Sequence, residues 1–149
     1  MAEIRTMRTE DAAAVARLCL DLGYEATEAE IHARFARLSS REDNQVWVAE
    51  LDGVVVGWVH CHGVHLLEAP PALEIGGLVV STAHQGKGLG KQLLRACEAW
   101  AVQLAYPRIR LRSGVHRVEA HAFYRHLGYR QLKTSHSFAL ELHDEASRP

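Results

Sequence analysis

Several features that mark secreted or membrane proteins are missing from this sequence. It has three cysteines, Cys19, Cys61 and Cys97, and their wide spacing and odd number do not predict a disulfide framework. No run of about 18 apolar residues is present, which argues against a membrane-spanning helix. The first residues carry charges throughout and lack the basic-then-apolar layout of a signal peptide. We therefore expect a cytoplasmic protein with free thiols.

The chain also lacks an excess of charge of either sign. Its 17 Lys and Arg residues nearly balance its 18 Asp and Glu residues, so no global field favours nucleic acid or an anionic membrane. A local basic loop that binds a phosphate group is compatible with this balance. With 149 residues, of which 48% are hydrophobic and 23% charged, the chain predicts a single globular domain over residues 1–149.

Apolar periodicity predicts an α/β fold with four helices and a mixed sheet. The helices are expected at residues 15–22, 27–38, 89–100 and 120–127. The strands are expected at residues 4–7, 45–51, 54–62, 73–81, 108–113, 129–133 and 137–142. Asp52-Gly53 is the strongest hairpin signal. This order of elements implies helices on both faces of the sheet, and the helix between the fourth and fifth strands implies a parallel pair.

The segment at residues 77–91 is the most informative one chemically, since it leads from a buried strand through a glycine-rich loop into an amphipathic helix. Glycines at every second position from Gly86 to Gly90 let the backbone approach a ligand. Successive amides at the start of the helix, with Lys87 and Lys91, form an anion site for which a diphosphate is the natural occupant. The alternative is a glycine-rich turn with no ligand.

Two well-known phosphate loops do not match this segment. A Walker loop requires Ser or Thr after its Gly-Lys pair, and here Gln92 follows Lys91. A dinucleotide-binding fingerprint requires its third glycine at the position that Lys91 occupies. Both readings fail.

Two motifs resemble the GCN5-related N-acetyltransferase (GNAT) superfamily. Residues 85–90 read Gln-Gly-Lys-Gly-Leu-Gly, similar to the family's Gln/Arg-x-x-Gly-x-Gly/Ala signature, and follow the expected strand at 78–80. Residues 117–129 resemble the family's fourth-helix motif, which ends in Leu-Gly-Tyr/Phe. The resemblance extends over the whole order of elements. It implies a mostly antiparallel central sheet of six to seven strands, flanked by four helices and splayed between its fourth and fifth strands.

The same resemblance implies that acetyl-CoA is the co-substrate and that no metal is used. The backbone of the fourth strand would pair with the pantetheine arm as an added strand. Gly76-Gly77 is a candidate bulge in that strand, or a plain kink. The loop would hold the pyrophosphate, and Arg117 would contact the arm or lie on the surface. The expected cofactor contacts are Leu78, Val79, Val80, Gln85, Gly86, Lys87, Gly88, Leu89, Gly90, Lys91 and Arg117.

Tyr124 and Glu74 are the candidate catalytic residues. By the resemblance, the Tyr124 phenol would protonate the leaving thiolate, although its helical spacing also suits a core aromatic. Glu74 lies on a buried strand and is the first candidate for the base, with an ion pair as the alternative. A glutamate that some related protein acetyltransferases use falls at Arg112 here, which puts that mechanism in doubt. The Val79 amide is the expected oxyanion donor.

The acceptor is expected to be the primary amine of a small molecule, such as an aminoglycoside, a polyamine or an amino acid. By the resemblance, residues 62–72 shape its pocket, and Glu68 would attract a cation. A protein N-terminus or lysine is an alternative acceptor, and a non-catalytic acyl-CoA-sensing module is a second alternative. His60, His62 and His65 could bind a metal, but the pattern favours a place in the acceptor pocket or on the sheet surface. A homodimer through the last strands is compatible with the resemblance.

Overall fold

The structure is a computed structural model that describes residues 2–145. The chain consists of two compact units, which divide between Arg112 and Ser113 and are described separately. The first unit contains β1 (Glu3–Thr6), α1 (Ala12–Cys19), α2 (Glu28–Ser39), β2 (Asn44–Leu51), β3 (Val54–Leu66), β4 (Ala69–Val80), α3 (Leu89–Gln103) and β5 (Ile109–Leu111). The second unit contains α4 (Val118–His126).

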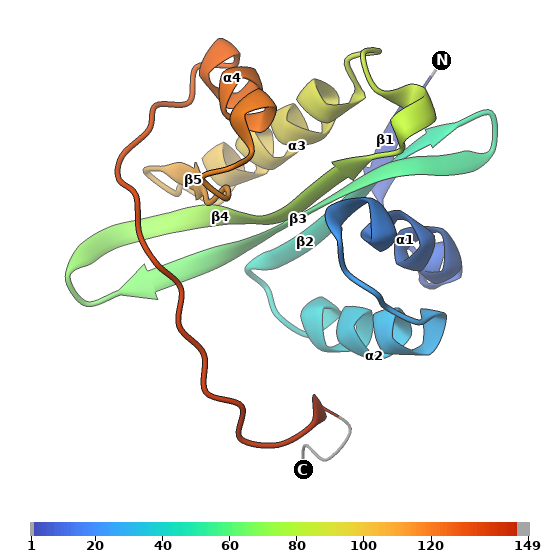
Figure 1. Cartoon of the computed structure of the whole chain (residues 1–149), viewed down its shortest axis with the longest axis horizontal. Coiled ribbons are helices and arrows are strands. Elements are labelled where there is room, and N and C mark those ends of the chain that lie inside the picture. Colours follow the sequence, from blue (N-terminus) through green and yellow to red (C-terminus); the bar gives the residue numbers. More distant parts are fainter. Residues whose placement is uncertain (1, 146–149) are drawn as a thin grey trace. The chain divides into compact units, whose positions relative to one another are not determined.

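The strands of the first unit form one sheet in the order β1-β2-β3-β4-β5 (Figure 1). The pairs from β1 to β4 are antiparallel, and β5 runs parallel to β4 after the crossover through α3, as predicted. The β2–β3 turn is formed by Asp52 (φ 51°) and Gly53 (φ 79°). Two successive positive φ angles are what a tight two-residue hairpin turn requires, so the Asp-Gly prediction is confirmed.

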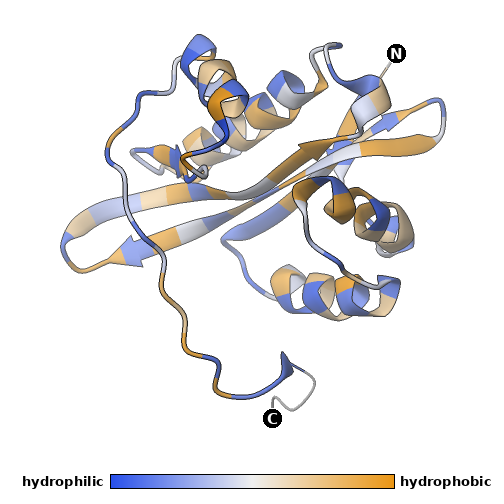
Figure 2. Cartoon of the chain, in the orientation of Figure 1, coloured by the Kyte–Doolittle hydropathy of each residue, from blue (hydrophilic) through white to orange (hydrophobic). Residues whose placement is uncertain are grey.

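Helices cover both faces of the sheet. Neighbouring residues of a strand point to opposite faces, and apolar residues in the central strands lie on both. Val46 and Val48 of β2 belong to the apolar cluster that α1 closes. Trp47, between them, points to the other face, where its ring meets Trp100 of α3 edge-on at a centroid distance of 5.7 Å. Hydrophobic colouring concentrates in the central strands, whereas the helices carry both colours (Figure 2). None of the helices in the described part of the chain is long and apolar enough to cross a bilayer.

Local signals in the sequence set the ends of several helices. Thr27 Oγ1 accepts from the Glu30 amide while the Glu30 carboxylate accepts from the Thr27 amide, which is a capping box at the start of α2. Gly23 (φ 84°) follows α1 and a short 3-10 turn, and Gly128 (φ 100°) follows α4. Both glycines have the left-handed conformation that ends a helix at little steric cost.

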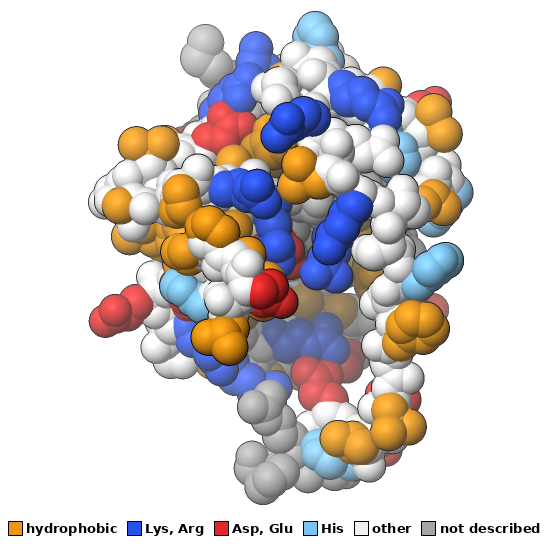
Figure 3. Space-filling model, turned by 90° about the vertical axis from the view of Figure 1, so that its left-hand side faces the viewer, with side chains coloured by type: hydrophobic (Ala, Val, Ile, Leu, Met, Phe, Trp, Pro, Cys, Tyr) orange, Lys and Arg blue, Asp and Glu red, His pale blue; other side chains and the backbone are white. Residues whose placement is uncertain are grey.

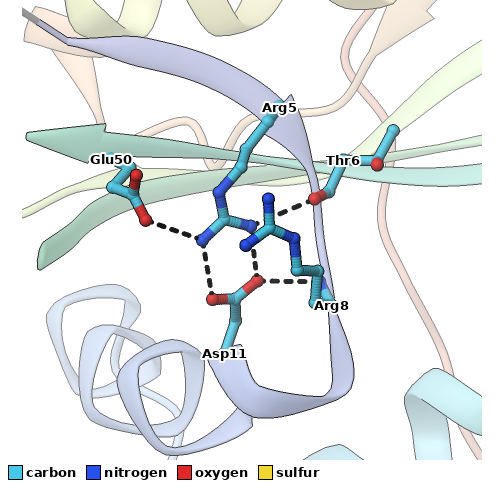
Figure 4. A network of polar contacts seen from close by, with 5 residues as sticks. All are labelled: Arg5, Thr6, Arg8, Asp11 and Glu50. Atoms are coloured by element: carbon cyan, nitrogen blue, oxygen red, sulfur yellow. Dashed lines mark hydrogen bonds and ion pairs between the residues drawn. The ribbon is translucent and has the colours of Figure 1, made fainter. Parts of the chain in front are cut away.

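A buried charge network joins β1, β2 and the turn before α1 (Figure 4). The Arg5 guanidinium donates to both oxygens of Asp11, at 2.8 and 2.9 Å, and to Glu50 at 3.0 Å. The Arg8 amide donates to Asp11 at 2.7 Å, and Asp11 is only 7% exposed. Burial by itself raises the pKa of Asp11, but the hydrogen bonds from Arg5 and the Arg8 amide outweigh it and leave this pKa lowered.

The two C-terminal strands predicted at residues 129–133 and 137–142 are wrong for the described part of the second unit, which contains α4 and an extended segment without strand pairing. The sheet therefore has five strands among the described residues, not six to seven. Phe138, Leu140 and Leu142 alternate along this segment and are 93%, 83% and 82% exposed. Hydrophobic side chains stand out on its surface in Figure 3. Alternation predicts an extended backbone, but a strand also requires a partner for its amides and carbonyls.

Candidate functional site

One edge of β4 is open along the second half of the strand. The parallel pairing with β5 consists of Leu73–Ile109, Glu74–Arg110 and Ile75–Leu111, and it stops there. β4 continues to Val80 and stays paired with β3 on its other side. β5 ends at Leu111, so among the residues of the first unit this edge of β4 has no strand partner after Ile75, and the predicted splay of the two strands stays a prediction. The unpaired edge leaves a short row of main-chain groups that an extended ligand can pair with as an added strand.

The register of the β3–β4 ladder decides which main-chain groups reach this open edge. The Ser81 amide donates to the Val56 carbonyl at 2.8 Å, and Trp58 is the partner of Val79. Because peptide groups alternate in direction along a strand, those of Val79 also point toward β3. Those of Leu78 and Val80 point to the open edge. The structure therefore places two of the three predicted strand contacts at the edge, and Val79 between them faces the neighbouring strand.

The predicted bulge is present at Gly76. His60 pairs with Gly77 and the next residue, Cys61, pairs with Ile75, so Gly76 is an extra residue on β4. A Cβ atom built on Gly76 would lie 2.9 Å from Nδ1 of His60, and one on Gly77 would lie 2.8 Å from the Trp58 ring. Both glycines thus leave room for side chains of β3 that lie across β4.

The glycine-rich loop after β4 presents its backbone amides outward. Gly86 (φ 81°) and Gly88 (φ 79°) have left-handed conformations, and Gly88 is the residue before the first turn of α3. Gln85 and Gly86 form a hydrogen-bonded turn, and no backbone acceptor for the amides of residues 88–91 is recorded among residues 2–145. The Gln85 side chain donates to the Val80 carbonyl at 3.1 Å and ties the loop to the end of β4. Free amides at the start of a 15-residue helix form an anion site.

The side chains of this loop divide into those that anchor it and those that face solvent. Leu89 is 4% exposed and anchors the first turn of α3 in the core. Lys87 and Lys91 are exposed, so their positive charges are available to a bound diphosphate. Gly90 is half-buried and brings no side chain between the helix and a ligand.

Glu74 takes part in a cluster of charges on β3, β4 and β5. Its Oε1 accepts from Arg110 Nε at 2.9 Å and lies 3.8 Å from Arg112 Nε. Its Oε2 lies 3.6 Å from Nε2 of His62, and the Glu74 side chain is 15% exposed. The ion pair that the sequence offered as the alternative role of Glu74 is therefore present, while its role as a base stays a prediction.

His60 lies beside this cluster, stacked on the His62 ring at a centroid distance of 5.4 Å. Its Nε2 is 2.9 Å from Oδ1 of Asn44, a residue that the sequence did not single out. The pKa of His60 is lowered to about 4, chiefly by burial and further by the neighbouring His62. His65 lies apart with an exposed ring, 3.7 Å from Asp43. Across residues 2–145, no group of three or more His, Cys, Asp or Glu side chains could hold a metal ion.

Tyr124 and Arg117 lie in the second unit. Tyr124 is half-buried within α4, and its ring lies 5.4 Å from Phe123 and 6.1 Å from Tyr129, measured between centroids. Burial raises the pKa of the Tyr124 phenol, and the charge of Arg117 opposes this shift. The phenol is thus protonated at neutral pH and can donate. Arg117 is exposed and immediately precedes α4.

Known proteins that resemble this chain identify its family. Residues 10–129 match the model of the acetyltransferase (GNAT) family. The chain belongs to this family. It is 29% identical over 147 residues to an aminoglycoside N(6')-acetyltransferase type 1 of Stenotrophomonas maltophilia, with 96% of this chain and 95% of that protein covered.

Two further similarities show the reach and the limit of this assignment. Human N-acetylaspartate synthetase is 34% identical over 94 residues, which is 63% of this GNAT chain but only 30% of that protein. The chain therefore spans less than a third of that relative's length. The structure of aminoglycoside N-acetyltransferase AAC(6')-Iy in complex with CoA superposes with a TM-score of 0.84 over 95% of this chain and 96% of that one. At 15% identity, this similarity shows the fold alone.

Proposed function

We propose that this GNAT chain transfers the acetyl group of acetyl-CoA to a primary amine of a small molecule, by direct attack in a ternary complex. Two main-chain features carry the proposal: the edge of β4 that β5 leaves unpaired at Leu78, and the amides at the start of α3 for which no backbone acceptor is recorded among residues 2–145. The edge suits an extended amide-bearing arm, and the loop suits two adjacent phosphates. Coenzyme A combines these two parts in one molecule.

The open edge also suits the reaction itself. The amide of Leu78 points out of β4 toward the place where an added strand would lie, so it is the donor we assign to the developing oxyanion. The Val79 amide points to β3 and does not suit this role. By the family resemblance, Tyr124 is the residue that we propose as the proton donor to the leaving thiolate. Bringing both reactants together in one site supplies much of the acceleration.

A small-molecule acceptor is supported by the similarity to the aminoglycoside acetyltransferase of Stenotrophomonas maltophilia, which extends over nearly the whole of both chains. A cytoplasmic location and a homodimer stay predictions.

A free-thiol release assay tests the proposal. Acetyl-CoA is incubated with neamine, spermidine, aspartate, glucosamine 6-phosphate and a peptide with a free N-terminus, and CoA is measured with and without protein. We expect release to depend on at least one of the small amines. Release with the peptide alone would favour a protein acetyltransferase, and binding of acetyl-CoA without release from any amine would favour an acyl-CoA-sensing module.

A further inference from the structure

We infer that His60 is the group that accepts the proton of the attacking amine, through Nδ1 of its imidazole ring. The inference rests on the proposed function and names a residue of the same site. It follows from three features: a side-chain relay that fixes which ring nitrogen carries the proton, the glycine bulge beneath that ring, and the ion pairs that occupy Glu74.

The relay begins at Asp43, whose carboxylate is only an acceptor when ionised. The Asn44 amide nitrogen donates to Oδ1 of Asp43 at 3.1 Å, which fixes the orientation of the Asn44 amide group. Its carbonyl oxygen Oδ1 then faces Nε2 of His60 at 2.9 Å. Because this oxygen can only accept, Nε2 must carry the hydrogen. In a neutral His60, Nδ1 consequently carries no hydrogen, and its lone pair can accept a proton.

The bulge on β4 provides the space into which this lone pair points. Nδ1 lies 2.9 Å from the position of a Cβ atom on Gly76, so any other residue there would crowd it. Gly76 is exposed and lies where the pairing between β4 and β5 has ended. The Nδ1 atom has no recorded hydrogen-bond partner among the described residues. His60 is the partner of Gly77, so in the register of the sheet its ring lies one residue along β4 from Leu78, whose amide is assigned to the oxyanion.

Burial and the neighbouring His62 favour the neutral form of His60. His62 stacks on it from the same strand, Asp43 acts through Asn44, and the Glu74 carboxylate is shared between His62 and Arg110. The low pKa of His60, which follows from burial and from His62, means that the ring is neutral at physiological pH and returns a captured proton readily to water. Glu74 is less suited to the task because Arg110 already occupies one of its oxygens.

The step converts an amine and a thioester into an amide and a thiol, and it closes when the proton taken up by His60 returns through solvent to Tyr124. The amine nitrogen forms a bond to the thioester carbonyl carbon and loses a proton to Nδ1 of His60. As the tetrahedral intermediate collapses, the C–S bond breaks and its electron pair leaves with the CoA sulfur, which takes a proton from Tyr124. No metal, oxidant or further reactant is needed.

The first test reads the tautomer of His60 and does not depend on turnover. Two-dimensional 15N–1H spectra of the histidine rings in the free protein at pH 7, assigned with His60→Gln, distinguish a protonated from an unprotonated Nδ1. We expect a neutral ring with hydrogen on Nε2. A ring with hydrogen on Nδ1, or one charged at pH 7, would overturn the inference.

The second test compares rates of CoA release with the panel amine that wild-type protein acetylates fastest. We expect His60→Gln to lower kcat about 100-fold or more while the KM for acetyl-CoA changes less than threefold. Gly76→Ala, which crowds Nδ1 while keeping the histidine, is expected to lower kcat as well. His143→Gln, an exposed histidine of the C-terminal segment, is the matched control and should retain the wild-type kcat.

The possible failures are distinguishable. Wild-type protein that acetylates no amine would defeat the proposed function. Wild-type turnover together with a His60→Gln protein that melts normally and keeps a kcat within threefold would defeat only the assignment of His60. If His60→Gln does not fold, the Gly76→Ala rate and the wild-type spectrum still decide the matter, since Gly76 is not in the left-handed region and tolerates alanine in its backbone.

Discussion

The two halves of the candidate site use different parts of the chain. From Leu78 to Lys91 the site is built from main-chain amides and carbonyls, and the side chains there mostly anchor the loop or lie in solvent. Beside the bulge the site is built from side chains of β2, β3, β4 and β5 that interact with one another. Main-chain groups are present whatever the side chains are, so they suit a cofactor that is the same in each acetyltransferase. Side chains can differ from one acetyltransferase to the next, so they suit an acceptor that also differs. The comparison predicts that cofactor affinity and acceptor chemistry can be changed independently.

The largest effect is expected for Tyr124, the proton donor proposed in the second unit. Tyr124→Phe should lower kcat about 100-fold, equivalent to about 3 kcal/mol, since the thiolate would leave without a proton donor. The dissociation constant of acetyl-CoA should change little. Steady-state CoA release and calorimetry measure the two quantities. Tyr129→Phe, which removes the hydroxyl of a neighbouring ring, is the control, and an equal loss of rate in that variant would contradict a specific role for Tyr124.

The Asp11→Ala variant changes a residue outside both halves of the candidate site, and it tests whether a loss of stability by itself lowers activity. Asp11→Ala leaves the Arg5 guanidinium buried without its main partner and should lower the free energy of unfolding by about 3 kcal/mol. Chemical denaturation measures this change, with the exposed neighbour Glu10→Ala as the control. At temperatures where the protein remains folded, kcat and the affinity for acetyl-CoA should be unchanged.

The same variant has a pH dependence whose sign follows from the lowered pKa of Asp11. Because the folded-state pKa lies below the unfolded one, the carboxylate contributes its full stabilisation above about pH 5 and loses it as the pH falls through the folded-state value. The difference in stability between wild type and Asp11→Ala should therefore shrink on acidification. A difference that stays constant down to acid denaturation would show that the charge of Asp11 is not its cause.

A smaller effect is expected in the main-chain half. Gly88→Val places a branched residue at φ 79°, which costs about 1–2 kcal/mol, and the loop should relax and weaken acetyl-CoA binding about tenfold. Gly53→Val is a matched control, since Gly53 has the same φ and also has no atom within 4 Å of its built Cβ. Calorimetry should find weaker binding only in the Gly88 variant. Equal affinities in both variants would mean that the loop does not hold the phosphates.

The smallest effect is expected for Glu74→Gln, which removes one negative charge from the side-chain half. We expect the KM of a cationic amine to rise about threefold, typical of a partly exposed charge, while the affinity for acetyl-CoA stays the same. Kinetics at two salt concentrations separate charge attraction from other effects. A 100-fold loss of kcat with an unchanged KM would instead identify Glu74 as the base and would contradict the role of His60.

The same contrast explains what the sequence could predict. The glycine-rich loop, the Asp52-Gly53 turn and the Thr27 cap depend on neighbouring residues, so local spacing was enough to find them. The relay from Asp43 to His60 depends on the register between β2 and β3, which brings Asn44 and His60 together from positions 16 residues apart. In the sequence, only the high density of histidines on β3 pointed to this part of the site. It indicated where the site lies but did not indicate what His60 does there.

The C-terminal segment shows the opposite error. Residues 137–142 alternate between apolar and polar side chains, and from that alternation a strand was predicted. Whether an extended segment becomes a strand depends on a distant partner that alternation does not reveal. Asp11 was missed for a related reason, because its partner Arg5 contacts it through the packing of β1 against the turn before α1.

The open edge of β4 has a consequence for the protein in the absence of its co-substrate. Unpaired amides and carbonyls on a partly apolar strand are a template on which another polypeptide can align, and self-association begins at such places. A pantetheine arm that pairs with Leu78 and Val80 would cover them, and any ligand that binds only the native state also raises its stability. The supply of acetyl-CoA is therefore expected to govern how long the protein stays dispersed and intact, in addition to how fast it works.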